Sequence, residues 1–232
     1  KRQVLDSMSR MAKGRYGELT PLGARQHRGI AERMYKNFPE IFKGQVEIDA
    51  RSTVVIRCIL SMMAECNQLQ ALNPKLRFKN DASYHDMYYM NFSGDPHIKE
   101  MRKSPEVKAA KEAIRKEHIH PERLMKTLFA NTDYLKWKVD AGELMTSLFD
   151  VASNMQSHDI GLELYSLFTK EECYDLWQLS NRGWYISFGP SPLTKGEMPS
   201  VEANLLENIL NTADTCVVRK DSYATCLLYT SD

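Results

Sequence analysis

The sequence lacks the features that mark several large classes of protein. It has no apolar run of the roughly 18–20 residues that a membrane-spanning helix needs, and its formal net charge is only +1. Such a small charge creates no overall field that would favour nucleic acid or a membrane surface. A glycine-rich phosphate loop and a Gly-x-Ser-x-Gly nucleophile elbow are also missing. We therefore expect no membrane span and no nucleic-acid partner.

The cysteines are few and widely spaced. None of the five forms a Cys-x-x-Cys pair, so the sequence predicts neither a zinc site nor a redox motif. Cys58 and Cys66 fall within a predicted helix, where we expect small buried residues and not a disulfide. Cysteine usage leaves the cellular compartment open.

Both ends of the sequence look foreign to the rest. The opening residues, Lys1-Arg-Gln-Val-Leu-Asp6, are not those of a signal peptide. Lys1–Gln3 and Cys226–Asp232 resemble translated sequencing adapters. We expect both ends to be artefactual and the chain to be an internal fragment of a longer protein.

What is present is typical of an ordinary globular protein. The 232 residues are 43% hydrophobic and 26% charged, which suffices for one large domain or two small ones with a real core. Apolar periodicity, capping residues and turn signals predict alternating helices and strands in the first part of the chain. They are helices at 4–13, from Thr20 to Asn37 and at 53–70, the last capped by Ser52 or Thr53, with strands at 45–50 and 76–79.

The middle of the chain has a different composition. From 86 to 184 it is charged, poor in β-branched runs and rich in helical patterns. We expect an α/β core built from the two ends of the chain, 1–85 and 185–232, with an α-helical domain inserted at 86–184.

The returning part of the core begins with a helical pattern. An amphipathic helix is predicted at 200–215. Its apolar residues are expected to face inward: Val201, Leu205, Leu206, Ile209 and Leu210. Val217 and Val218 then predict the beginning of a final strand.

The turn between strand 45–50 and helix 53–70 is the most informative place for chemistry. Ligands of open α/β sheets bind beyond the carboxyl ends of strands, and a helix start offers free N–H groups and the positive end of its dipole. Arg51 and Arg57 bracket this start. Because a guanidinium can bind phosphate through two parallel hydrogen bonds, the turn suggests a phosphate site. Taken alone the signal is weak, since an arginine near a helix start is more often a surface charge or a carboxylate partner.

Two motifs resemble those of the histidine acid phosphatases. Gly17-Glu-Leu-Thr-Pro-Leu-Gly-Ala-Arg-Gln-His27 is similar to their Gly-x-Leu-Thr-x-x-Gly-x-x-Gln-His stretch. Ala50-Arg-Ser-Thr-Val-Val-Ile-Arg-Cys-Ile-Leu-Ser-Met62 is similar to their Arg-Ser-Thr-x-x-x-Arg-Thr-x-x-Ser segment, with Cys58 in place of its usual Thr. Weaker matches at Gly189–Pro192 and Asn204–Asp214 resemble the multiple inositol-polyphosphate phosphatase and phytase branch, particularly its bacterial members.

The resemblance implies a phosphoglycerate-mutase-like, three-layer α/β core, truncated here, with an inserted α-helical cap domain. The phosphate-binding role of the family's second arginine maps to Arg57. Arg51 maps to a residue that we expect to support the strand–helix turn, and His27 to a family position other than the nucleophile. The family's nucleophilic His lies in an Arg-His-Gly-x-Arg motif upstream of Gly17, and its proton donor in a His-Asp or His-Ala-Glu motif after the final strand. This sequence has neither.

The activity that the resemblance implies is hydrolysis of phosphate monoesters, with inositol polyphosphates such as phytate as the expected small phosphorylated substrate. A neutral His attacks phosphorus, arginines offset the charge on the oxygens, and a carboxylic acid protonates the leaving oxygen. No metal or cofactor is required. With Arg57 but neither the nucleophile nor the acid, we expect this polypeptide to be inactive on its own.

Two other functions stay open. A broad-specificity acid phosphatase is the alternative within the same class, and a non-catalytic, mainly helical binding or interaction protein is the alternative outside it. The resemblance also implies periplasmic or secreted placement. The oligomeric state is not indicated.

Four further sets of residues have a functional and a structural interpretation. Arg77 and Lys79 follow the predicted sheet edge and could bind substrate in the cleft. The His85-Asp86 pair precedes the helical insertion, so we expect a structural role. His118 and His120 could bind a metal on an extended segment, but a helix-end interaction with the dipole is favoured. Basic residues at 99–116 could attract a polyanion, yet interleaved glutamates favour a solvated helix.

Overall fold

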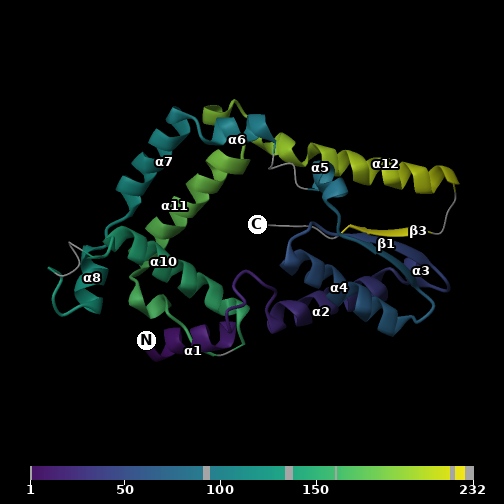
Figure 1. Ribbon diagram of the computed structural model, residues 1–232, viewed down its shortest axis with the longest axis horizontal. Helices are drawn as coiled ribbons and strands as arrows, with labels where there is room; N and C mark the ends of the chain where they lie inside the picture. The colour runs from purple at the N-terminus through teal and green to yellow at the C-terminus, as the bar shows by residue number, and fades with distance from the viewer. Residues whose placement is uncertain (1, 91–94, 134–137, 160, 220–222, 228–232) are drawn as a thin grey trace. The chain divides into compact units, whose positions relative to one another are not determined.

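The computed structural model describes residues 2–90, 95–133, 138–159, 161–219 and 223–227. The chain forms two compact units (Figure 1). The helical unit consists of Lys1–Gly14 and Pro96–Pro199, and the sheet unit of Arg15–Asp95 and Ser200–Asp232. Within the described ranges, no helix is long and apolar enough to cross a membrane.

The sheet unit is organised around three parallel strands. They are β1 (Glu47–Arg51), β2 (Arg77–Asp81) and β3 (Tyr223–Leu227), in the order β2-β1-β3. Glu47 is in register with Arg77 on one side and with Tyr223 on the other. Because β1 is central and parallel to both neighbours, its carboxyl end at Arg51 lies at the same edge as those of β2 and β3.

Two long helices cover one face of this sheet. They are α2 (Pro21–Asn37) and α4 (Ile56–Leu72), which lie side by side below the strands in Figure 1. The alternation of β1 points Ile48 and Ala50 toward them, and both side chains are fully buried. The apolar core here also takes in α3 (Pro39–Phe42) through Phe42.

The other face of the sheet carries shorter elements and the last helix. These are the 3₁₀ turn η1 (Tyr84–Asp86), α5 (Met87–Met90) and α12 (Ala203–Arg219). The Asn204 side chain donates to the Tyr88 carbonyl across 3.2 Å, which joins α12 to α5. Figure 1 shows α12 on the opposite side of the sheet from α2 and α4. The sheet therefore has helices on both faces, as expected for an α/β layered core.

The helical unit contains α1 (Arg2–Ala12), α6 (Pro96–Arg102), α7 (Pro105–His118), α8 (Glu122–Leu128), α10 (Ala141–Asn154) and α11 (Lys170–Phe188). Among the described residues, the 3₁₀ turns η3 (Met155–Ser157), η4 (Tyr165–Leu167) and η5 (Pro192–Thr194) accompany them. A further turn, η6 (Met198–Glu202), runs across the division after Pro199. Its main core is built from Leu124, Met145, Leu164 and Leu176, all at most 1% exposed. Val4 and Met8 of α1 pack against this core.

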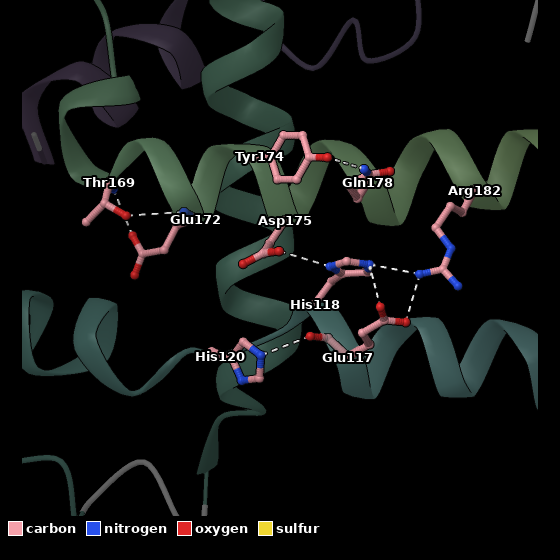
Figure 2. Close-up of polar contacts among 9 residues, drawn as sticks. All are labelled: Glu117, His118, His120, Thr169, Glu172, Tyr174, Asp175, Gln178 and Arg182. Atoms are coloured by element: carbon pink, nitrogen blue, oxygen red, sulfur yellow. Dashed lines mark hydrogen bonds and ion pairs between the residues drawn. The ribbon is translucent and has the colours of Figure 1, made fainter.

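Side chains at the helix starts explain where these helices begin. Ser104 caps α7, Asp140 caps α10 and Thr169 caps α11. At α11 the cap is reciprocal, because Glu172 bonds back to the Thr169 N–H (Figure 2). In the sheet unit, Thr20 caps α2 by accepting from the Gly23 N–H at 3.0 Å, which confirms the predicted helix start.

The predicted elements match the structure closely in the first part of the chain, with one error. The expected cap of the second long helix at Ser52 or Thr53 is wrong. The helix begins only at Ile56, and its N-cap residue is Val55, which contributes no side-chain hydrogen bond. The strands begin and end within two residues of the predicted positions.

The predicted final strand at Val217 and Val218 is also wrong. Helix α12 continues to Arg219, and these two valines are 77% and 82% exposed. Two of the leucines expected to face inward, Leu206 and Leu210, are more than half exposed. The parallel strand β3 follows at Tyr223–Leu227, so it includes two residues of the end expected to be artefactual. Lys1 and 228–232 lie outside the described residues.

The two compact units have other bounds than the domains predicted at 1–85, 86–184 and 185–232. The first helix belongs to the helical unit because its apolar residues pack there, and the divisions fall after residues 14, 95 and 199. The interpretation of the helical unit as a cap on a catalytic core stays a prediction.

Candidate functional site

The turn from β1 to α4 lies at the carboxyl edge of the parallel sheet. The Ser52 N–H donates to the Asp81 carbonyl at 3.0 Å, so the turn is fastened to the end of β2. Ser52 is also buried, and its hydroxyl donates to the Thr53 carbonyl at 2.8 Å. The turn is therefore held in place where open α/β sheets bind ligands.

Helix α4 begins without the features that satisfy most helix starts. No side chain caps it and its first turn contains no acidic residue. The first N–H groups of a helix have no partner within the helix and carry the positive end of its dipole. The start of this 17-residue helix can therefore receive an anion.

Thr53 adds a second indication at the same turn. Its side chain is 2% exposed, and its hydroxyl has no hydrogen-bond partner among the described residues. Burying a hydroxyl without a partner costs about 1–3 kcal/mol. A polar atom kept at that cost next to an uncapped helix start is suited to a ligand oxygen.

Arg57, the predicted phosphate ligand, is the second residue of α4. Its side chain is half-buried, and its carbonyl accepts a hydrogen bond from the Ser61 hydroxyl at 2.9 Å. The structure thus brings Arg57 and Thr53 to one turn, at the helix end where an anion is favoured.

Arg51 is held by contacts within the sheet unit. Its guanidinium donates two hydrogen bonds to the Asp49 carboxylate, both 2.9 Å, and a third to the Tyr89 hydroxyl at 2.9 Å. The buried carboxylate of Asp86 lies 3.6 Å away. The hydrogen bonds to Asp49 and Tyr89 raise the pKa of Arg51 further above its usual range. Arg51 therefore ties β1 to η1 and α5, in agreement with the supporting role expected for it.

Sequence reasoning did not find the partners of Arg51. Asp49 stands two residues earlier on the same strand face, so the alternation of β1 could have indicated that pair. Asp86 and Tyr89 come from a later segment and gave no such signal. Burial raises the pKa of Tyr89, and the Arg51 guanidinium opposes that shift. The His85-Asp86 pair is split, with His85 exposed and Asp86 buried near Arg51.

Arg77 and Lys79, the other predicted binding residues, are not brought to the turn. Arg77 opens β2 at the amino edge of the sheet, and it donates to the Gln45 side-chain oxygen at 3.0 and 3.1 Å. Lys79 forms an ion pair with Glu47 of the neighbouring strand. Arg57 follows the opposite, carboxyl edge, so these three residues do not form one cluster along the strands.

His27 and Glu65 connect the two helices beneath the sheet. The Nδ1 atom of His27 lies 2.7 Å from the carboxylate of Glu65, whose side chain is only 3% exposed. The His27 ring thus links α2 to α4. The expectation that it is not the nucleophile stays a prediction.

The two histidines at the end of α7 differ in their contacts. His118 is buried, with its Nδ1 2.9 Å from Asp175 and its Nε2 3.0 Å from Arg182, both on α11 (Figure 2). His120 lies 3.0 Å from the Glu117 carbonyl. His118 therefore links two helices, and only His120 has the helix-end contact that was expected. Among the described residues, no three His, Cys, Asp or Glu side chains are placed to hold a metal ion.

Comparison with solved structures finds proteins of similar fold. No family model matches the sequence, and no curated protein sequence matches it. The fold is similar to the crystal structure of a Bifidobacterium longum multiple inositol polyphosphate phosphatase in complex with inositol hexasulfate, with a TM-score of 0.67 and 15% sequence identity. The match covers 91% of this chain and 60% of that one, so the chain spans less than two thirds of that protein's length.

Proposed function

We propose that this chain is part of a histidine-phosphatase-type phosphomonoesterase that acts on inositol polyphosphates, and that the β1–α4 turn binds the phosphoryl group. The observation that carries the proposal is the fold likeness to the Bifidobacterium longum phosphatase over 91% of the chain. The start of α4 supports the proposal independently. It brings together Arg57, an uncapped helix end and the Thr53 hydroxyl, which has no hydrogen-bond partner among the described residues.

In this proposal each group at the turn has a defined task. The Arg57 guanidinium donates to the oxygens of the phosphoryl group and offsets their charge. The first N–H groups of α4 and the Thr53 hydroxyl donate to the same oxygens. Arg51 positions the turn through Asp49 and Tyr89 and does not contact the substrate.

The groups that would make and break bonds are not assigned to residues of this chain. The reaction needs a neutral histidine that attacks phosphorus and an acid that protonates the leaving oxygen. The Arg-His-Gly motif that carries the histidine in the family does not occur in this sequence. We therefore expect the chain to bind inositol polyphosphates without hydrolysing them.

Isothermal titration of the chain with inositol hexasulfate tests the phosphate site. Arg57→Ala should weaken binding about tenfold or more, because a hydrogen bond to a charged group is worth about 1.5–3 kcal/mol. Arg77→Ala is the matched control and should leave the affinity unchanged. Equal losses in the two variants, or no binding by a folded chain, would overturn the assignment of the site.

Extending the reading frame upstream separates the enzyme from a non-catalytic binding protein. An Arg-His-Gly-x-Arg motif before Gly17 supports the phosphatase, and its absence from the full-length protein rejects it. Turnover of inositol hexakisphosphate against 4-nitrophenyl phosphate by the full-length protein then separates a phytase from a broad-specificity acid phosphatase.

A further inference from the structure

A groove of about 520 Å³ lies between α7 and α11 of the helical unit. Its volume falls within the range typical of small-molecule sites, about 300–1,000 Å³. Both walls belong to the same compact unit, so the groove does not depend on the β1–α4 turn.

The α11 side of the groove is aromatic. Trp184 and Phe188 stack with their ring centroids 4.6 Å apart and their planes 26° from parallel. They are 54% and 41% exposed, and the apolar side chains of Ile114 and Leu179 line the groove beside them. An exposed stacked pair of this kind offers a flat surface to another ring.

The α7 side is cationic. Lys108, Lys111 and Arg115 all line the groove, at helix positions that share one face. Lys111 is half-buried, and its ammonium donates to the Ser187 hydroxyl of α11 at 2.8 Å, which directs it across the groove. Glu112 is the carboxylate among the lining residues and pairs with Lys116, while Arg115 pairs with Glu143. Lys108 and Lys111 therefore give the lining its net positive charge.

Arg102 holds the aromatic wall in place. Its guanidinium carbon lies 4.3 Å from the centre of the Phe188 ring, and its Nε donates to the Ser187 carbonyl at 2.9 Å. Burial lowers the pKa of Arg102. A cation held over the ring and bonded to the Ser187 carbonyl near the end of α11 fixes Phe188 before any ligand arrives.

We propose that this groove binds a small aromatic anion, with its ring against Trp184 and its anionic group against Lys111 and Lys108. A neutral aromatic ligand would leave the lysines without a counter-charge, and a small anion without a ring would leave the aromatic wall uncovered. The site is independent of the proposed phosphatase function.

Titration of the chain with 2-naphthalenesulfonate, followed by calorimetry, tests the proposal. Saturable 1:1 binding is expected, and Lys111→Met and Trp184→Leu should each weaken it about tenfold. Trp184→Phe, which keeps an aromatic ring, should bind more tightly than Trp184→Leu. Lys170→Met and Trp177→Leu are matched controls on α11, outside the groove lining, and should bind as the unchanged chain does.

Three results would overturn the proposal. They are absence of saturable binding, equal affinity for neutral 2-naphthol or for methanesulfonate, and equal losses in Trp177→Leu and Trp184→Leu. Circular dichroism of each variant shows whether the helical fold is kept. Arg57→Ala should leave 2-naphthalenesulfonate binding unchanged, so the groove and the β1–α4 turn can fail separately.

Discussion

The guanidinium of Arg51 forms two 2.9 Å hydrogen bonds to the carboxylate of Asp49, two residues earlier on the same face of β1. These two bonds use one edge of the guanidinium. Its Nη1 atom donates a further hydrogen bond to the Tyr89 hydroxyl at 2.9 Å. Arg51 is therefore held by contacts within the sheet unit at the end of β1, while Arg57 lies on the first turn of α4.

Arg51→Ala should lower the free energy of unfolding by about 1–3 kcal/mol, because it leaves the buried Asp86 carboxylate and the Tyr89 hydroxyl with fewer partners. Urea unfolding monitored by circular dichroism measures the change. Arg77→Ala, at an exposed position, should cost less than about 0.5 kcal/mol. Similar losses for both substitutions would contradict the supporting role of Arg51.

Thr53→Val should raise the free energy of unfolding by about 1 kcal/mol, because it removes a buried hydroxyl that has no partner within the described residues. The same substitution should weaken inositol hexasulfate binding. Ser52→Ala is the neighbouring control. It removes a hydroxyl that does have a partner, so it should lower stability by about 1 kcal/mol. A loss of stability in Thr53→Val would refute the view that this hydroxyl is reserved for a ligand.

His27→Ala should destabilise the packing of α2 on α4 by about 2 kcal/mol, because the buried Glu65 carboxylate loses its 2.7 Å partner. Glu65→Gln should cost less, since a neutral amide needs less compensation when it is buried. The double variant completes a cycle of urea unfolding measurements. Additive losses would mean that the two side chains do not interact.

Because of Cys66, the free energy of unfolding should fall as the pH rises from about 9 to about 11. Burial raises the pKa of its thiol from the ordinary 9.0 to about 11, so above pH 9 the unfolded chain loses this proton first. The protonated thiol makes its full contribution to the free energy of unfolding below pH 9. About 2–3 kcal/mol of this contribution is lost as the pH passes 11. Cys66→Ala removes it, so the stability difference between the two proteins should shrink over this window. A constant difference would show that burial does not hold the thiol protonated.

The sequence was sufficient to predict the position of helices and strands that have strong local signals. Thr20-Pro21 combines a capping hydroxyl with a residue suited to the first helical turn, and the structure begins α2 there. The alternation around Ile48 likewise located β1. These signals act over a few residues, so they do not depend on the rest of the fold.

The incorrect predictions concern residues whose conformation or position depends on contacts with distant parts of the chain. Ser52 and Thr53 are good helix caps by composition, but the bond from Ser52 to Asp81 of β2 keeps them outside the helix. Val217 and Val218 have side chains that favour strands, yet they continue the exposed end of α12. The separation of Arg77 from Arg57 depends on the parallel register of β1 and β2, which no local pattern in either strand specifies.

The central position of β1 imposes an order on assembly. One edge of β1 can pair as soon as the chain has reached Asp81, while the other waits for Tyr223–Leu227, after the whole helical unit has been synthesised. The entropic cost of closing a loop grows only slowly with its length. The long separation of β1 from β3 therefore slows folding more than it lowers stability. During that interval the unpaired N–H and C=O groups of β1 are a template for a strand of another molecule. The yield of refolding should therefore fall as protein concentration rises, and the cause would be this single strand edge.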